Sequence, residues 1–219
     1  MRPDAPRSAR VPAEATPVDV TVAVGTYGDD TWRDLAIERA IPSAEALGVP
    51  VIHCHADTLH DARNDALAQV TTEWVCHLDA DDELEPGYFD AMARATGDVL
   101  APAVRYVYAN GIKRSPRMPR VAGHHHRCHT GCLPQGNWLI VGSLVRTDMA
   151  TGVGGWRDFT WSEDWDLWLR CYLAGASFTP VPGAIYRAHV RTDSRNRSVQ
   201  GEERLAAHRA IAEANGVAV

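Results

Sequence analysis

Short apolar runs alternate with amphipathic stretches along most of the chain. Runs rich in apolar and β-branched residues predict strands at 18–24, 51–55, 73–78, 99–108, 139–146, 177–181 and 184–188. Between them, apolar positions at helical spacing predict helices at 31–47, 59–70, 86–96, 163–174 and 202–214. This alternation predicts an α/β fold with a doubly wound, mostly parallel sheet flanked by helices.

Two regions lack the alternating pattern. Residues 1–17 are rich in Pro, Ala and Arg without the apolar segment of a secretory signal, so we expect a disordered tail. Residues 109–135 are rich in Gly, Pro, Arg and His, and we expect a long basic loop or lid. The predicted domain therefore spans 18–198, with 199–219 as a C-terminal helix that packs on it or extends it.

The composition is that of a globular protein with one substantial core. The chain has 219 residues, of which 45% are hydrophobic and 23% charged, and its formal net charge is −6. No apolar run approaches the roughly 18 residues that a transmembrane helix needs. Two of the five cysteines, Cys54 and Cys76, fall inside predicted core strands, which favours a reducing, cytoplasmic location.

The charge is unevenly distributed. Residues 99–147 contain no Asp or Glu but several basic residues, among them Arg114, Arg117 and Arg120. Such segregation predicts a basic surface that faces an anionic partner on the acceptor side of a site. A flexible basic loop without a partner is the alternative.

The most informative motif follows the apolar run 74–78. Asp79, Asp81 and Asp82 come directly after it, where the carboxyl end of a buried parallel strand would open onto solvent. Carboxylates at alternate positions there can hold a hard divalent cation, which in turn binds phosphate oxygens. The alternative is a solvated loop that caps the next helix.

Six motifs, the aspartate motif among them, occur in an order that closely resembles the family 2 nucleotide-sugar glycosyltransferases of the GT-A fold. The motifs are Thr26-Tyr27, Ala62-Arg63-Asn64, Leu78-Asp79-Ala80-Asp81-Asp82, Gly154-Gly155-Trp156, Ser162 to Arg170, and Tyr186-Arg187-Ala188-His189. The resemblance covers residues 18–196. It implies a metal-dependent, inverting transfer of a sugar from a nucleoside diphosphate, with UDP as the expected nucleotide, to an acceptor hydroxyl.

The resemblance assigns the metal site to the aspartate motif. Asp79 corresponds to the residue that contacts the ribose, and Asp81 to the ligand of a Mn²⁺ or Mg²⁺ on the diphosphate. The metal would act as a Lewis acid on the leaving diphosphate. His189 resembles the histidine that completes this metal site, with a purely structural histidine as the alternative.

Other donor contacts follow from the same resemblance. Thr26 and Tyr27 correspond to the loop around the base, although Tyr27 could also be a structural turn residue. Arg63 resembles the phosphate-side arginine, with an exposed helix charge as the alternative. The family's base-reading aspartate is replaced by a different sequence, so either Asp57 or His55 takes that place and the base stays open.

On the acceptor side, Asp164 corresponds to the general base, which takes the proton of the attacking hydroxyl. Glu163 and Trp165 beside it are expected on the acceptor side. Helix capping and interaction with the helix dipole are the alternative for both acids. The acceptor itself is not specified; an anionic one, such as modified nucleic acid, a phosphorylated glycan or a protein, fits the basic segment.

Two other classes of function stay open, as does a zinc site. A nucleotidyltransferase should carry a basic phosphate loop after the first strand, and residues 25–30 have no basic residue. A non-catalytic nucleotide-sugar binding module would not need Asp79, Asp81, Asp164 and His189 together. Cys128 and Cys132, with the histidines at 124–126 and 129, could bind zinc, but their spacing is not that of a zinc ribbon or finger, and a polar acceptor loop is the alternative.

Overall fold

The computed structural model describes residues 17–121, 130–191 and 201–218. In these residues one sheet of seven strands has the order β2-β1-β3-β6-β5-β7-β4. The strands are β1 (Val20–Tyr27), β2 (Val51–Ala56), β3 (Trp74–Leu78), β4 (Glu83–Leu84), β5 (Val99–Tyr108), β6 (Leu144–Arg146) and β7 (Phe178–Val190). An α/β fold is therefore confirmed.

The sheet is mixed, which corrects the prediction of a mostly parallel one. Strand β1 is parallel to β2 and β3, and β5 is parallel to β7, but β6 is antiparallel to both β3 and β5, and β4 is antiparallel to β7. A parallel neighbour needs a crossover connection, usually a helix. The described residues between β5 and β6 include only a 3₁₀ turn, and β6 enters the sheet in the opposite direction.

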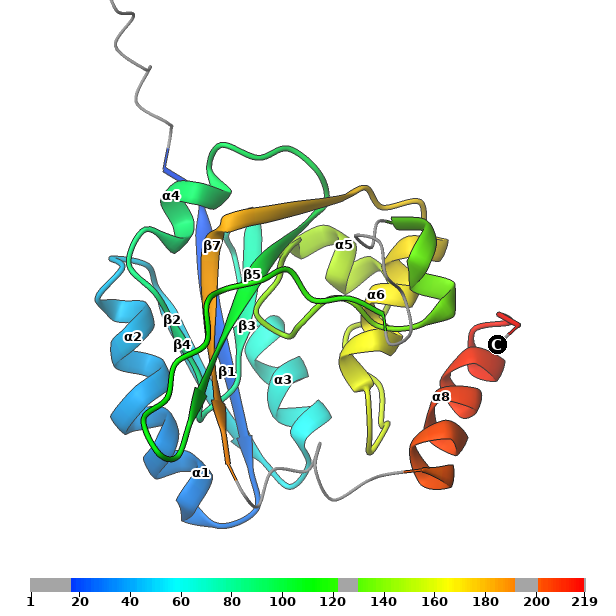
Figure 1. Cartoon of the computed structure of the whole chain (residues 1–219), viewed down its shortest axis with the longest axis horizontal. Coiled ribbons are helices and arrows are strands. Elements are labelled where there is room, and N and C mark those ends of the chain that lie inside the picture. Colours follow the sequence, from blue (N-terminus) through cyan, green and yellow to red (C-terminus); the bar gives the residue numbers. More distant parts are fainter. Residues whose placement is uncertain (1–16, 122–129, 192–200, 219) are drawn as a thin grey trace, which may run out of the picture.

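Helices cover both faces of the sheet (Figure 1). The helices are α1 (Asp30–Leu35), the π-helical η1 (Ala36–Ala40), α2 (Ile41–Glu45), α3 (Leu59–Leu67), α4 (Tyr88–Met92), the 3₁₀ turn η2 (Thr130–Gln135), α5 (Thr147–Gly152), α6 (Glu163–Leu173) and α8 (Glu202–Ala214). Successive residues of β1 face opposite layers: Val22 and Val24 pack with α1 to α2, whereas Ala23 packs in the layer of α3 and α6.

Some predicted elements have different extents. Only residues 144–146 of the predicted strand 139–146 join the sheet, and the two short strands predicted at 177–188 form the single strand β7. The segment before β6 packs closely on β7, because a Cβ atom on Gly142 would lie 2.1 Å from Cδ2 of Tyr186. This close contact leaves residues 136–143 as an irregular segment that borders the site.

The first described part of the predicted basic loop, residues 109–121, pairs with β5. The backbone N–H of Val104 donates to the carbonyl of Arg117 at 2.9 Å, and that of Arg117 donates back at 3.1 Å. Residues 109–121 therefore turn back along β5 instead of forming a free loop. Residues 122–129, with most of the possible zinc ligands, and the predicted tail at 1–16 lie outside the described residues.

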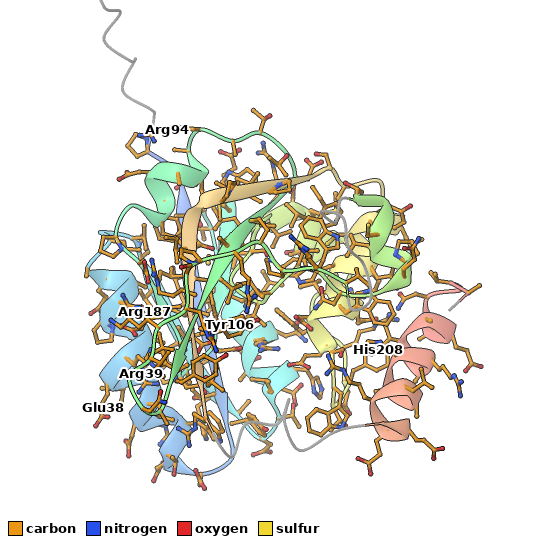
Figure 2. All side chains as sticks on the ribbon, viewed as in Figure 1. Glu38, Arg39, Arg94, Tyr106, Arg187 and His208 are labelled. Atoms are coloured by element: carbon orange, nitrogen blue, oxygen red, sulfur yellow. The ribbon has the colours of Figure 1, made fainter. Side chains whose placement is uncertain are left out.

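The C-terminal helix α8 packs against the layer of α6. Ile211 and Ala212 are buried in the layer of α6, and Asn215 hydrogen-bonds the buried Asp166 at 2.9 Å. Figure 2 shows His208 on the side of α8 that faces the domain. No helix in the described ranges is both long and apolar enough to cross a bilayer.

Candidate functional site

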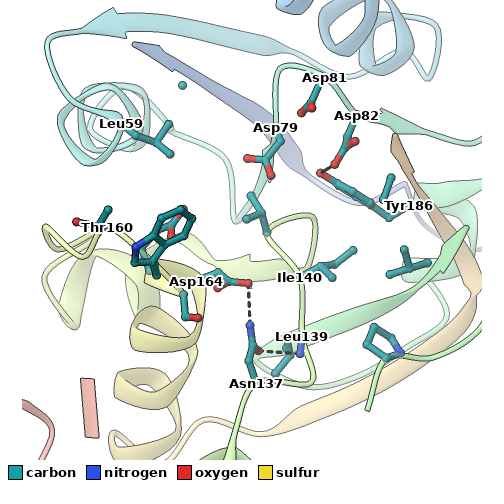
Figure 3. Close-up of a pocket in the computed structure, with 18 of the residues that line it drawn as sticks. Leu59, Asp79, Asp81, Asp82, Asn137, Leu139, Ile140, Thr160, Asp164 and Tyr186 are labelled. Atoms are coloured by element: carbon teal, nitrogen blue, oxygen red, sulfur yellow. Dashed lines mark hydrogen bonds between the residues drawn. The ribbon is translucent and has the colours of Figure 1, made fainter. Parts of the chain in front are cut away.

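A cleft of about 610 Å³ opens at the carboxyl ends of β1 and β3. Its other walls come from residues 119–121 and 135–141, the start of α6, and α8. Seven of the predicted site residues line it: Thr26, Tyr27, Asp79, Asp81, Arg120, Glu163 and Asp164. Figure 3 shows Asp79 and Asp81 on one side of this pocket and Asp164 on another. The fold thus brings the two acidic motifs, more than 80 residues apart in sequence, to one cavity.

The aspartate motif concentrates negative charge in the turn after β3. Burial and the charge of Asp79 raise the pKa of Asp81 to about 6. Asp82 is buried behind it, where its carboxylate accepts hydrogen bonds from the hydroxyl of Tyr186 and the backbone N–H of His189, both at 2.7 Å. Asp82 therefore anchors the turn to β7, and Asp79 and Asp81 are left at the cleft.

Arg63 connects the aspartate motif with the start of α6. Its guanidinium donates to Oδ1 of Asp79 at 2.7 Å and to Oε1 of Glu163 at 3.0 Å. The side chain of Arg63 is only 3% exposed. Gly25 leaves room for it, since a Cβ atom there would lie 2.8 Å from Cγ of Arg63. The predicted phosphate arginine is thus a buried bridge between two carboxylates.

Two aromatic side chains lie behind this bridge. The guanidinium of Arg63 stacks on the indole of Trp156 at 4.2 Å from the ring centroid. The indole Nε1–H donates to Nε2 of His77 at 3.1 Å. Burial, with a smaller effect of the Arg63 charge, lowers the pKa of His77 to about 3.

Asp164 projects into the cleft from the first turn of α6. Its Oδ2 accepts a hydrogen bond from Nδ2 of Asn137 at 2.7 Å, and its Oδ1 accepts one from the backbone N–H of Trp165 at 2.8 Å. The amide of Asn137 is itself oriented, because its Oδ1 accepts from the backbone N–H of Leu139 at 2.9 Å. Burial and the nearby charge of Glu163 raise the pKa of Asp164 to about 7. The carboxylate therefore satisfies one helix amide and still titrates where a general base is most useful.

Trp165 does not lie where it was predicted. It is fully buried, and its indole N–H donates to the carbonyl of Leu133 at 2.8 Å. Helical geometry explains the correction, because consecutive residues of a helix point in different directions and α6 turns Trp165 into the core. Its ring packs against that of His208, with 4.9 Å between the ring centroids and 47° between the planes.

Four other predicted residues lie outside the lining of the cleft. His189 faces Glu83, with 2.6 Å between Nε2 and Oε2. Asp57 is exposed just after β2, and Arg114 and Arg117 are exposed on the segment that follows β5. The residues of β2 that contact the cleft residue Thr26 are His53 and His55. Oγ1 of Thr26 lies 2.9 Å from Nε2 of His53 and 3.0 Å from Nδ1 of His55.

The cleft also contains residues that the sequence did not predict. Arg204 and His208 of α8 line it, and Asn137 holds Asp164. Nε2 of His208 lies 3.3 Å from the hydroxyl of Ser162. Ser162 directly precedes the acidic pair Glu163 and Asp164 at the start of α6. The spacing of four places Arg204 and His208 on one face of α8. What the sequence lacks is any sign that this face meets the cleft.

Asp79 and Asp81 are the residues best placed to hold a divalent cation. Both are oxygen ligands at the cleft, as Mg²⁺ and Mn²⁺ prefer. Among the described residues, no group of three or more His, Cys, Asp or Glu side chains is arranged around one metal position. Any metal here would therefore need oxygens from a substrate or from water to complete its coordination.

Comparisons with solved structures place the fold. The crystal structure of S. aureus TarS 1-349 in complex with UDP-GlcNAc matches with a TM-score of 0.60 and 16% sequence identity, over 90% of this chain and 66% of that chain. TarS 1-349 in complex with UDP matches with a TM-score of 0.51 and 17% identity, over 79% of this chain and 61% of that one. This chain spans about two thirds or less of the length of these structures.

At these identities the likeness shows the fold alone, and no curated protein sequence matched the chain. The family assignment comes from a family model. The model for glycosyl transferase family group 2 matches residues 74–202, which is more than half of the chain and includes the aspartate motif, Trp156 and the acidic pair of α6. The chain therefore belongs to glycosyl transferase family group 2.

Proposed function

We propose that the protein is a metal-dependent glycosyltransferase that moves a sugar from a nucleoside diphosphate to an acceptor hydroxyl. The observation that carries the proposal is the shared cleft, where Asp79 and Asp81 lie opposite Asp164. Asp79 and Asp81 are placed to hold the divalent cation that binds the diphosphate of the donor. Asp164 is placed to take the proton of the acceptor hydroxyl. The TarS structures that share the fold hold UDP-GlcNAc and UDP, which supports a UDP-sugar as the donor.

The proposed reaction is a single displacement with inversion at the anomeric carbon. The acceptor oxygen forms a bond to that carbon while the bond from the carbon to the diphosphate oxygen breaks. Asp164 accepts the proton of the acceptor hydroxyl, and the bonding electrons leave with the nucleoside diphosphate. The hydrogen bonds from Asn137 and from the Trp165 amide fix the orientation of the carboxylate for this proton transfer.

A Mn²⁺ or Mg²⁺ ion would be held by Asp81 together with the donor's phosphate oxygens, with Asp79 beside it on the ribose side. When bound, it would supply Lewis-acid stabilisation of the leaving diphosphate. Nε2 of His189 could join this site only by giving up its contact with Glu83. In our proposal Arg63 holds Asp79 in place and does not contact the phosphates, since its side chain is only 3% exposed and does not line the cleft.

The nucleotide base is assigned to the end of β1. Thr26 and Tyr27 line the cleft there, and Thr26 contacts His53 and His55 of the neighbouring strand β2. This contact favours His55 over the exposed Asp57 as the residue that contacts the nucleotide base. We also keep the cytoplasm as the proposed compartment, on the cysteine pattern.

An anionic acceptor is the proposal that best fits the basic residues of the cleft. Arg120 and Arg204 both line it. A guanidinium there would bind a phosphate or carboxylate of the acceptor while the hydroxyl reaches Asp164. A phosphorylated glycan, a nucleic acid or an acidic protein would each meet this requirement.

A thermal-shift panel of nucleoside diphosphates with and without Mn²⁺ tests the donor side directly. We expect UDP to raise the unfolding temperature more in the presence of Mn²⁺ than in its absence. Hydrolysis of UDP-sugars then tests turnover. Binding of UDP-sugars without any turnover would indicate a binding module, and turnover of nucleoside triphosphates with release of diphosphate would indicate a nucleotidyltransferase.

A further inference from the structure

Strand β3 contains one polar residue in an otherwise apolar and fully enclosed run. His77 is 1% exposed, and it lies between Cys76 and Leu78 in the centre of the sheet. Its ring meets that of Trp156 edge-on, with 4.9 Å between the ring centroids and 82° between the planes. His77 does not line the cleft, and the proposed reaction does not use it.

The hydrogen bond to Trp156 fixes the proton of this ring. An indole N–H can only donate, so Nε2 of His77 accepts, and the proton of the neutral imidazole sits on Nδ1. Among the described residues, Nδ1 has no hydrogen-bond partner. A buried donor without a partner costs free energy, so stability of the core alone does not account for a histidine here.

The backbone of Trp156 is held as firmly as its side chain. Its N–H donates to Oδ1 of Asn64 at 2.8 Å, and its carbonyl accepts from Nδ2 of the same side chain at 2.8 Å. A Cβ atom on the preceding Gly155 would lie 2.4 Å from that Oδ1, which keeps the position small. With the backbone fixed by Asn64, the bond to His77 determines the plane of the indole.

The plane of the indole matters because Arg63 lies on it. The guanidinium is 4.2 Å from the ring centroid and reaches Asp79 on one side of the cleft and Glu163 on the other. A tilted indole would displace the guanidinium, and with it the two carboxylates that it joins.

We propose that His77 is a positioning residue that acts through Trp156 and Arg63 to set the separation of Asp79 and Glu163. The inference rests on the proposed function, because that separation matters only if donor and acceptor meet between these groups. A misplacement of about 1 Å caused by a change far from the reacting atoms can lower the rate by about 10²-fold.

The test compares His77→Phe, which removes the acceptor atom, with His77→Gln, whose side-chain oxygen can accept the indole N–H. For UDP-sugar hydrolysis we expect kcat of His77→Phe to fall about tenfold with KM changed less than twofold, and His77→Gln to recover most of that loss. Cys76→Ala is the matched control, since Cys76 is equally buried in β3 but faces the other layer. It should lower the unfolding temperature and leave kcat unchanged.

Indole N–H signals in a spectrum of ¹⁵N-labelled protein report the hydrogen bond itself. Trp156→Phe identifies the signal of Trp156, which should shift in His77→Phe and return toward its place in His77→Gln. The signal of Trp165, bonded to Leu133, should stay fixed. If His77→Phe does not fold, His77→Leu serves in its place, because it removes the acceptor of the same bond and leaves the indole under Arg63; it should show the same fall in kcat.

An unshifted Trp156 signal, or a wild-type kcat in His77→Phe, overturns the proposal. If the wild-type protein hydrolyses no UDP-sugar, the proposed function fails, and a crystal structure of His77→Phe decides the positioning role. Displacement of Arg63 from the indole supports that role, and an unmoved Arg63 overturns it.

Discussion

Replacement of Asp164 by Asn tests the proposed general base. The substitution keeps the shape of the side chain and its bond from the Trp165 amide, but the amide cannot take a proton from the acceptor. A positioned general base contributes about 10²–10⁴-fold to the rate, so we expect kcat to fall by that factor while UDP still binds with Mn²⁺.

The pH dependence gives the prediction a second magnitude. With a pKa of about 7, Asp164 must lose its proton before it can act. The value of kcat/KM should therefore fall about tenfold per pH unit below 7 and be about 100-fold below its plateau at pH 5. Transfer or hydrolysis assays between pH 5 and 9 measure this limb, which should be absent from the residual activity of Asp164→Asn.

Stability should follow the same group with a definite sign. The folded protein binds the proton of Asp164 more tightly than the unfolded chain does, since the pKa is raised from 3.8. The free energy of unfolding of the wild type, relative to Asp164→Asn, should therefore decrease as the pH rises from about 4 to 7. Urea titrations at several pH values measure this difference.

Glu163→Gln is the comparison, because it changes the neighbouring acid of the same helical turn and should reduce kcat less. If Asp164 serves only as a helix cap, Asn replaces it well and activity stays near wild type. A fully active Asp164→Asn enzyme with an unchanged acidic limb would place the base elsewhere and refute the reasoning.

Three further substitutions test other parts of the site. Asp81→Ala should abolish the extra stabilisation of the UDP complex by Mn²⁺, measured by thermal shift, and full activity of the wild type in EDTA would contradict a metal site. Arg63→Met should lower the free energy of unfolding by about 3 kcal/mol in urea titrations, because it leaves Asp79 and Glu163 without their common partner; an unchanged stability would mean that the bridge is incidental. Gly142→Ala should destabilise the protein by about 1–3 kcal/mol through the clash of its Cβ atom with Tyr186, and a smaller effect would show that the ring can move aside.

Local patterns in the sequence predicted the regular elements well. The run from Val20 and the run 74–78 are strands because alternating or continuous apolar residues fit a buried sheet, and the acidic turn after β3 lies at the cleft because parallel strands end at one edge. The sequence could also place Glu163 and Asp164 at the start of a helix. These predictions depend only on near neighbours along the chain.

The predictions that failed, or could not be made, depend on contacts between distant residues. Whether residues 139–143 continue a strand is decided by the packing of Gly142 on Tyr186. The burial of Trp165 and the approach of α8 to the cleft follow from how helices dock. Arg63 could be linked to the site by its motif, but its bridge to Glu163 joins residues 100 positions apart, which no local pattern reveals.

The bridge by Arg63 also constrains how this site can change in evolution. Loss of Arg63 alone removes the cation that joins two acids, and loss of either acid alone removes one of the two carboxylates that bind a buried guanidinium. Each single change is therefore costly, and its cost depends on the residues already present at the other two positions. Positions 63, 79 and 163 should accept substitutions as a linked set, so an ancestor with a neutral residue at 63 is expected to have lacked at least one of the two carboxylates.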